Sequence, residues 1–416
     1  MHRPFRICGL ICLAIVPAMM GAGCPGLPDV GGFPRTAAWQ RRTINTGAAQ
    51  RPAVVAVADL DGDGKLDVVA GYTGEAAAGA AVVIFFQESP ESFTAVTISS
   101  GAELAGIAAL AIGDLDADTH ADIIAACNGR LIYLHSPANP RTAGGWTRST
   151  IDQSSGDGFA QWNDVAIGDI DQANGPDIVA CNAGPPGRVS WFRSPAANIA
   201  NGTGWTRVDI DATTRTNSAS VALADFSLDG RLDVVSTAPG EALNPVSWYR
   251  NPANPQVDPW TKFPIGNLAA ASRMVIVDLN VDGRTDVIAL NAPGRQIGWY
   301  VRPANATNAW TSAGFLLTQY TSATPVDVRA IDLTGDSQPN VVVATNTGGT
   351  LRWFMPTPGQ TQTAQWMENN IADVSETIGR IALGDINGNG RPDVIVPLRA
   401  ANAANDSIVW FENPEP

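Results

Sequence analysis

One nine-residue pattern recurs seven times along the chain at nearly constant spacing. Its first copy runs from Asp59 to Asp67 and carries aspartates at positions 1, 3, 5 and 9, with glycine at position 6. The copies begin at Asp59, Asp114, Asp169, Asp225, Asp278, Asp332 and Asp385, so successive copies lie 53 to 56 residues apart. A period this regular over the whole chain predicts a repeat architecture.

The residues of this loop favour calcium as the ion it would bind. Four carboxylates and the backbone carbonyl of position 7 offer hard oxygen ligands on one side of a tight turn, which glycine at position 6 permits. The loop is not an EF-hand, because its twelfth position is Ala70 and not a bidentate glutamate. Short apolar runs flank it at residues 54–58 and 68–70, so we expect it to connect two strands of a β-hairpin.

The copies differ in the number of oxygen ligands that they keep. The first two keep all four acids, although Thr119 replaces glycine in the second. The fifth exchanges one acid for an amide, and the fourth and seventh have fewer charges and should bind more weakly. The third and sixth carry Ala173, Thr334 and Asn340 in place of acids and are candidates for metal-free loops. The predicted calcium ligands are Asp59, Asp61, Asp63, Lys65, Asp67, Asp114, Asp116, Asp118, His120, Asp122, Asp225, Ser227, Asp229, Asp233, Asp278, Asn280, Asp282, Asp286, Asp385, Asn387, Asn389 and Asp393, with Lys65 and His120 contributing backbone carbonyls.

A different interpretation needs no metal. Loops rich in aspartate, asparagine and glycine also form plain turns whose side chains cap their own backbone. Seven copies in register argue against this for the best loops, because carboxylates crowded on one turn repel each other when no cation is present.

The spacing of aromatic residues predicts four strands per repeat. A third strand is marked by aromatic pairs such as Trp191-Phe192 and Trp248-Tyr249, and a fourth by Trp146, Trp205, Trp260, Trp310 and Trp366. Four strands in about 54 residues, repeated seven times, predict an all-β fold, a seven-bladed β-propeller of four-stranded blades.

The two ends of the chain predict how this ring closes. The last repeat stops at Pro416, directly after its third strand, and so lacks a fourth. Residues 38–44 resemble the fourth-strand segment 145–151, so we expect the N-terminal strand to complete the last blade. Such closure leaves no open sheet edge between the first and last blades.

The first 24 residues have the features of a targeting segment. Arg3 and Arg6 precede an apolar stretch that is too short for a membrane span, and small residues lead to Cys24. This resembles a bacterial lipoprotein signal, which predicts Cys24 as a lipid anchor and a periplasmic or cell-surface location; ordinary signal-peptidase cleavage is the alternative. Residues 25–37 then read as a Gly/Pro-rich tether, and residues 38–416 as the propeller.

Charge and cysteine content exclude some classes of protein. The net charge is −14, and about half of the 40 acidic residues lie in the seven loops. No basic stripe exists, so we expect no nucleic-acid partner, and we expect a monomer. Beyond the targeting segment and Cys24, only Cys127 and Cys181 remain, and we predict buried free thiols there.

The loops and their flanking strands resemble the FG-GAP/VCBS repeats of integrin-α-type propellers. The shared motif is Asp-x-Asp-x-Asp-Gly-x-x-Asp between two apolar strands, and the resemblance covers about residues 38–416. The Phe-Gly and Gly-Ala-Pro words of the family are poorly kept, with segments 237–240 and 291–294 the nearest to them, so the chain resembles the bacterial VCBS-like branch more than integrins. The resemblance implies calcium on one face and recognition on the other, but names no ligand.

The sequence lacks the motifs of familiar enzymes. It has no Gly-x-Ser-x-Gly elbow, phosphate loop or His-Glu-x-x-His, and its three histidines are His2, His120 and His135. Glycosidase or lyase chemistry based on carboxylates alone stays open, because such pairs are recognised in space and not in sequence.

Candidates for a binding site lie where the first strands begin, opposite the loops. They are Trp162, Asp164, Arg273, Asp327 and Arg380; the last four each stand five residues before the first aspartate of their loop. We expect them to meet around the mouth of the central channel, where an exposed tryptophan with arginine and aspartate would suit a sugar or a peptide carboxylate. Alternatively, these charges only line a wet channel and pair with one another.

Two functions therefore remain. The first is a calcium-binding, non-catalytic module outside the cytoplasm for adhesion or for recognition of carbohydrate or protein. The second is a propeller enzyme, a polysaccharide lyase or glycosidase, that acts on extracellular glycans.

Overall fold

The computed structural model describes residues 38–46, 50–74, 79–153, 161–184, 187–197, 199–215, 217–313, 324–346, 349–356 and 366–414. These belong to one compact unit, Ala37–Pro416. The expected signal segment, the anchor Cys24 and the tether lie outside the described residues. No helix in the described part of the chain is both long and apolar enough to cross a membrane.

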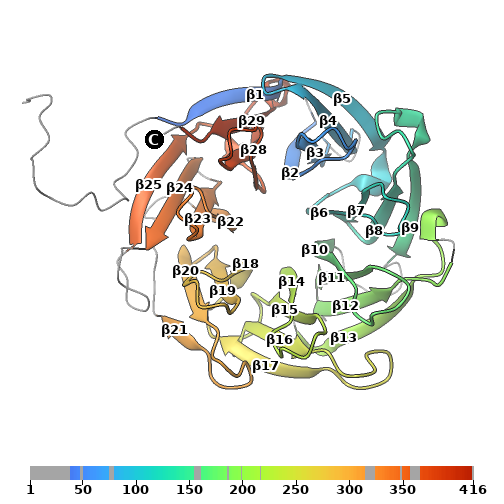
Figure 1. Ribbon diagram of the computed structural model, residues 1–416, viewed down its shortest axis with the longest axis vertical. Helices are drawn as coiled ribbons and strands as arrows, with labels where there is room; N and C mark the ends of the chain where they lie inside the picture. Colours follow the sequence, from blue (N-terminus) through green and yellow to red (C-terminus); the bar gives the residue numbers. More distant parts are fainter. Residues whose placement is uncertain are drawn as a thin grey trace, which may run out of the picture. The chain divides into compact units, whose positions relative to one another are not determined.

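Seven antiparallel sheets form a ring around a central channel (Figure 1). The innermost strands are β2 (Pro52–Ala58), β6 (Ala109–Gly113), β10 (Gln161–Gly168), β14 (Ser220–Ala224), β18 (Ala271–Val277), β22 (Pro325–Ile331) and, split in two, β26 (Thr377–Ile378) and β27 (Ala382–Gly384). The second strands are β3 (Asp67–Tyr72), β7 (Asp122–Cys127), β11 (Asp177–Ala183), β15 (Asp233–Thr237), β19 (Asp286–Asn291), β23 (Asn340–Thr345) and β28 (Asp393–Arg399).

The outer half of each blade completes the four-stranded sheet. The third strands are β4 (Ala81–Ser89), β8 (Arg130–His135), β12 (Gly187–Arg193), β16 (Val246–Arg250), β20 (Gln296–Val301), β24 (Thr350–Pro356) and β29 (Ser407–Glu412). The outer strands are β5 (Ser92–Ser100), β9 (Thr147–Gln153), β13 (Thr206–Arg215), β17 (Thr261–Gly266), β21 (Thr311–Ala313), β25 (Trp366–Asp373) and β1 (Gln40–Thr46). Short 3-10 helices occupy Ala102–Leu104, Ala143–Gly145, Ile199–Asn201 and Ala403–Asn405. The prediction of a seven-bladed, four-stranded propeller is confirmed.

The hydrophobic core lies between blades and not within one sheet. Among the described residues it divides into seven clusters, each of which joins two neighbouring blades, including the last and the first. Strands β3 and β7 are buried at every residue, because sheets cover both of their faces. The outer strand β5 instead alternates between exposed and half-buried residues. Cys127 and Cys181 are buried free thiols, as predicted.

The N-terminal strand closes the ring, as the repeat pattern predicts. Strand β1 pairs antiparallel with β29, from Gln40 opposite Glu412 to Thr46 opposite Ser407, and β29 pairs with β28. The side chain of Arg42 donates to Glu412 at 3.0 Å and to Glu91 of the first blade at 2.5 Å. One strand thus supplies the outer edge of the last blade and an ion pair to the first.

Removing β1 should destabilise the whole propeller. A protein that begins at Gln50 leaves β29 as an unpaired edge, and the lost ladder hydrogen bonds are worth about 0.5–1.5 kcal/mol each. We expect its melting temperature to fall by several degrees, measured by circular dichroism or scanning fluorimetry. A protein that begins at Ala37, which keeps β1, is the control; equal melting temperatures for the two proteins would contradict closure by this strand.

Candidate metal loops and the central channel

All seven hairpin loops share one backbone conformation. Position 4 has φ between 56° and 77°, and position 6 has φ between 68° and 83°, in every copy. The residues at position 6 are Gly64, Thr119, Asn174, Gly230, Gly283, Ser337 and Gly390. Left-handed φ favours glycine, yet Thr119 and Ser337 adopt it too, so the fold imposes the same turn on loops whose sequences depart from the pattern.

The aspartate at position 1 organises this turn. In the first loop, Asp59 accepts backbone N–H groups from Gly62 at 2.8 Å and Gly64 at 2.9 Å. Asp278 and Asp385 accept the N–H of the glycine at position 6 in the same way, each at 2.7 Å. The first carboxylate therefore holds its own loop, as the metal-free interpretation predicts, while it also stays half-buried or exposed at the turn.

The acid at position 9 is fully buried and ties the loop to the third strand. Asp67 accepts the N–H of Leu60 at 3.0 Å and the N–H of Gln87, in β4, at 2.9 Å. Burial raises the pKa of Asp67 to about 6, although these two N–H groups oppose the shift. Burial raises the pKa in the same way to about 6 for Asp122, Asp177, Asp233 and Asp286, and to about 7 for Asp393. In the sixth loop Asn340 accepts the equivalent N–H from Leu333 at 2.8 Å.

The residue at the end of the third strand whose backbone N–H donates to this acid also contacts the neighbouring blade through its side chain. The side chain of Gln87 donates to the carbonyl of Ile386, which is position 2 of the loop in the preceding blade, at 2.6 Å. Asn251 donates to Ile170, and Asn413 to Leu333, at 2.8 and 2.9 Å. Arg302 donates to Phe226 at 2.5 Å. In four blades, therefore, hydrogen bonds run from one loop through a buried acid to the loop of the blade before it.

Oxygen atoms of positions 1, 3 and 9 converge in the first three loops. In each of the sets Asp59, Asp61 and Asp67; Asp114, Asp116 and Asp122; and Asp169, Asp171 and Asp177, one oxygen per residue lies within 4.8 Å of the others. Opposite ligands of a calcium ion are separated by about 5 Å, so the donors fit this ion in spacing and in chemistry. The third loop, which the sequence marks as a candidate for a metal-free turn, has the same convergence.

The acid at position 5 faces a different partner. Asp63 accepts Nζ of Lys65 at 2.5 Å, and Asp229 accepts a guanidinium N–H of Arg231 at 2.5 Å. Asp282 pairs with Arg284. The basic side chain at position 7 therefore pairs with the acid at position 5. The sequence marks position 7 only for its backbone carbonyl.

Several side chains outside the loops contact position 3, among them Gln256 on Asp171 and Glu412 on Asn387, and the repeat pattern does not mark them. Nε2 of His135, at the end of β8, lies 3.0 Å from Asp116, and Arg193, at the same place in β12, donates to Asp171 at 2.5 Å. Arg141 donates to Asp61 at 2.5 Å from the second blade. Aligning the ends of the third strands would have identified His135 and Arg193, whereas Arg141 comes from a loop between strands and has no such signal.

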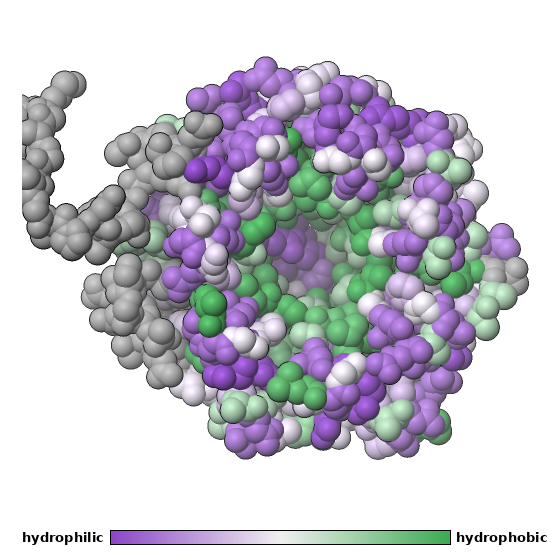
Figure 2. Space-filling model, viewed as in Figure 1, coloured by the Kyte–Doolittle hydropathy of each residue, from purple (hydrophilic) through white to green (hydrophobic). Residues whose placement is uncertain are grey.

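The central channel is walled by aliphatic side chains of the seven inner strands. Figure 2 shows hydrophobic residues around the hollow and hydrophilic residues at its floor. A cavity of about 440 Å³ lies within it, and its charged lining residues are Asp164, Arg329 and Arg380. The apolar lining residues include Leu110, Ile276 and Leu383. On the inner strands they lie nearer to the loops than the level of Asp164 and Arg380.

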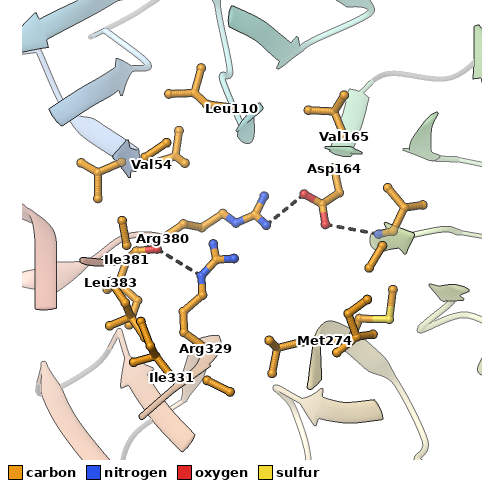
Figure 3. Close-up of a pocket in the computed structure, with 18 residues that line it drawn as sticks. Val54, Leu110, Asp164, Val165, Met274, Arg329, Ile331, Arg380, Ile381 and Leu383 are labelled. Atoms are coloured by element: carbon orange, nitrogen blue, oxygen red, sulfur yellow. Dashed lines mark hydrogen bonds and ion pairs between the residues drawn. The ribbon is translucent and has the colours of Figure 1, made fainter. Parts of the chain in front are cut away.

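Of the predicted channel residues, Asp164 and Arg380 form an ion pair with each other, whereas Asp327 and Arg273 have other partners. Arg380 donates to Asp164 at 2.9 Å across the ring from the seventh to the third blade (Figure 3). Asp327 accepts Nε of Arg329 at 3.2 Å, and Arg273 donates to the backbone carbonyl of Ala219. Equal offsets from the loops group four of these residues, whereas Arg329 lies outside that pattern.

The local charges decide the ionisation of this cluster. Burial alone would raise the pKa of Asp164, but the charges of Arg380 and Arg273 outweigh burial and hold it below the usual range. Burial and the neighbouring charge of Arg380 lower the pKa of Arg273 to about 10. Asp164 and Arg273 are therefore ionised at neutral pH.

The expectation that Trp162 is exposed at the channel mouth is wrong. Its side chain is fully buried and packs edge-on against Phe192, with ring centroids 5.5 Å apart. A β-bulge between Trp162 and Asp164 inserts one residue into β10, so the two side chains point to different faces. The same irregularity precedes Val54, Arg273 and Asp327, and it aims one residue of each strand into the channel.

Comparisons with known proteins agree with this architecture. The family described as FG-GAP-like repeat matches residues 59–125, 225–289 and 332–396. No protein of curated function matches the chain. Among solved structures, BBS1N in complex with ARL6DN, soaked with lead, is similar at a TM-score of 0.56 and 11% identity, over 91% of this chain and 98% of that one.

A fungal protein is also similar in structure. An Agrocybe aegerita lectin that recognises non-reducing terminal N-acetylglucosamine superposes with a TM-score of 0.49 at 16% identity, over 78% of this chain and 81% of that one. At these identities the likeness concerns the fold alone. With the three matched regions and the seven closed blades, the chain is a β-propeller that carries FG-GAP-like repeats.

Proposed function

We propose that this protein is a calcium-stabilised, non-catalytic β-propeller that recognises carbohydrate or protein outside the cytoplasm. The observation that carries the calcium assignment is the convergence of carboxylate oxygens from positions 1, 3 and 9 in three separate loops. Calcium would take these oxygens, which suit a hard cation, and would relieve the repulsion among acids that the fold forces together. Cys24 would attach the protein to a membrane through lipid.

The pairing of the channel acids supports recognition over catalysis. A general acid or base must be free to exchange a proton with its substrate. Asp164 is instead bound by Arg380 and by the hydroxyl of Ser220 at 2.6 Å, and Asp327 is buried beside Arg329. These acids suit a fixed charge pattern better than proton transfer.

Calcium should raise the melting temperature of the chelator-treated protein. Binding to the folded state contributes about 2.7 kcal/mol for each site at a concentration one hundred times its Kd. The double variant Asp59→Asn, Asp114→Asn should lose a clear share of this shift, measured by scanning fluorimetry. The exposed pair Asp258→Asn, Asp373→Asn makes the same change in net charge and should keep the full shift. A protein that does not respond to millimolar calcium would refute the assignment.

The calcium effect should depend on pH. The raised pKa of about 6 means that Asp67 and its equivalents take up protons as the pH falls through 6, and protonated acids are poor calcium ligands. In chelator the same protonation favours the folded state, because burying the neutral form costs less. Melting temperatures with calcium and with chelator should therefore differ most near pH 8 and converge near pH 5; a constant difference over this range would disprove the competition.

A glycan array, with and without chelator, tests recognition. We expect binding to at least one class of surface glycan or to a surface protein, and no release of reducing ends from polysaccharides. Turnover of any polysaccharide would replace this proposal with the enzyme hypothesis.

A further inference from the structure

The inner strands and the β26–β27 connection hold an excess of positive charge in an acidic protein. Among the described residues of these segments, the charged side chains are Asp164, Arg273, Asp327, Arg329 and Arg380, three arginines against two aspartates. The chain as a whole has a net charge of −14. The inner strands therefore differ in the sign of their charge from the chain as a whole.

Arg380 and Arg273 are tied to the fold by hydrogen bonds from their terminal nitrogens. Arg380 donates to the carbonyl of Ala108 at 2.8 Å and to Asp164 at 2.9 Å. Arg273 donates to the carbonyl of Ala219 and so caps the free edge of a neighbouring inner strand. These contacts join blades to one another.

Arg329 differs from Arg273 in that it lines the cavity, and from Arg380 in that its hydrogen bonds use Nε alone. Nε donates to Asp327 at 3.2 Å and to the carbonyl of Ile381 at 3.1 Å. Neither terminal Nη atom has a hydrogen-bond partner among the described residues, and the side chain is 32% exposed. Figure 3 shows both Nη atoms directed to the middle of the channel, beside the guanidinium of Arg380. Two adjacent guanidinium groups are stabilised when an anion binds near them.

The wall above these donors is aliphatic. Of the residues that line the 440 Å³ cavity, all except Asp164, Arg329 and Arg380 are apolar. A cavity of this size lies in the range that holds a small ligand, and a few polar groups in an apolar cavity set the orientation of that ligand. An apolar body would displace water from this wall, while a planar anion would pair with the fork of Arg329.

We propose that the channel binds an aliphatic carboxylate, with the carboxylate on the Nη atoms of Arg329 and the hydrocarbon body along the apolar wall. This inference deepens the proposed recognition function and rests on it, but it does not depend on calcium. Two sources share this chemistry, a free aliphatic acid and the C-terminal carboxylate of an apolar peptide.

Octanoate is the first probe, titrated into the full chain by isothermal calorimetry, in calcium and in chelator. We expect one site with a Kd below about 1 mM. Hexanoate should bind about tenfold more weakly, since each methylene adds to burial, and neutral methyl octanoate should bind at least about tenfold more weakly because it lacks the charge. Equal binding of octanoate and methyl octanoate would overturn the proposal without help from any variant.

Variants test the assigned residue. Arg329→Gln should weaken octanoate binding about tenfold, whereas Arg148→Gln, which removes an arginine of similar exposure from the outer strand β9, should leave it unchanged. Equal losses in both variants, or no loss in Arg329→Gln, would overturn the proposal. Melting temperatures establish that both variants are folded. The comparison of octanoate, hexanoate and methyl octanoate uses the unmodified protein and does not depend on either variant.

Met274 provides a local signal, because it lines the cavity. In methyl-labelled protein, the methyl resonance that Met274→Leu removes should shift during the octanoate titration, and an unshifted resonance would place the ligand elsewhere. An N-acetylated trileucine with a free C-terminus, compared with its amide, distinguishes the two sources: binding of the free peptide alone, without octanoate, assigns the peptide. If neither octanoate nor the peptide binds, the channel proposal fails while the calcium and glycan results stand.

Discussion

A buried acid that accepts backbone N–H groups at two places, position 2 of the loop and the end of the third strand, ties the inner hairpin to the third strand in four of the seven blades. It closes the inner hairpin through position 2 of the loop and fixes the end of the third strand, as Asp67 does with Leu60 and Gln87. Burying a carboxylate is costly unless it is hydrogen-bonded, and these N–H groups offset part of that cost. The remaining cost is visible in the pKa of about 6 that burial produces.

This interaction also couples blades. The residue whose backbone N–H donates to the acid also donates a side-chain hydrogen bond to the loop of the preceding blade. Gln87, Asn251, Arg302 and Asn413 perform this role with different side chains, each donating to the carbonyl at position 2. The candidate metal loops are therefore not independent hairpin tips. A cation bound in one loop would act on atoms that are hydrogen-bonded to the neighbouring blade, and so would stabilise more than its own loop.

The channel shows how ring closure creates chemistry that no single blade contains. The innermost strand of each sheet has one edge without a neighbouring strand, so its carbonyl groups need other donors. Arg273 donates to a carbonyl of the adjacent blade, and Arg380 reaches across the ring to the carbonyl of Ala108 in the second blade. Arg329 meets this need with Nε alone, and the rest of its guanidinium stays available in an otherwise aliphatic cavity.

The sequence by itself determined the repeat, the four strands of each blade, the loops and the strand that closes the ring. These follow from patterns that recur within one repeat, where alternation, turn residues and spacing act locally. It also grouped Asp164, Arg273, Asp327 and Arg380, because equal offsets from equal loops place residues at one level of a ring.

Only the tertiary structure decided which side chains face the channel and which basic groups reach the loops. The bulge in β10 directs the side chain of Trp162 into the core. In a regular strand, Trp162 and Asp164 would lie on one face, because they are two residues apart. Arg329 lies two residues from the expected level, and Arg141 reaches Asp61 from another blade. Such contacts depend on how sheets pack around a closed ring, and a local sequence pattern contains no information on that packing.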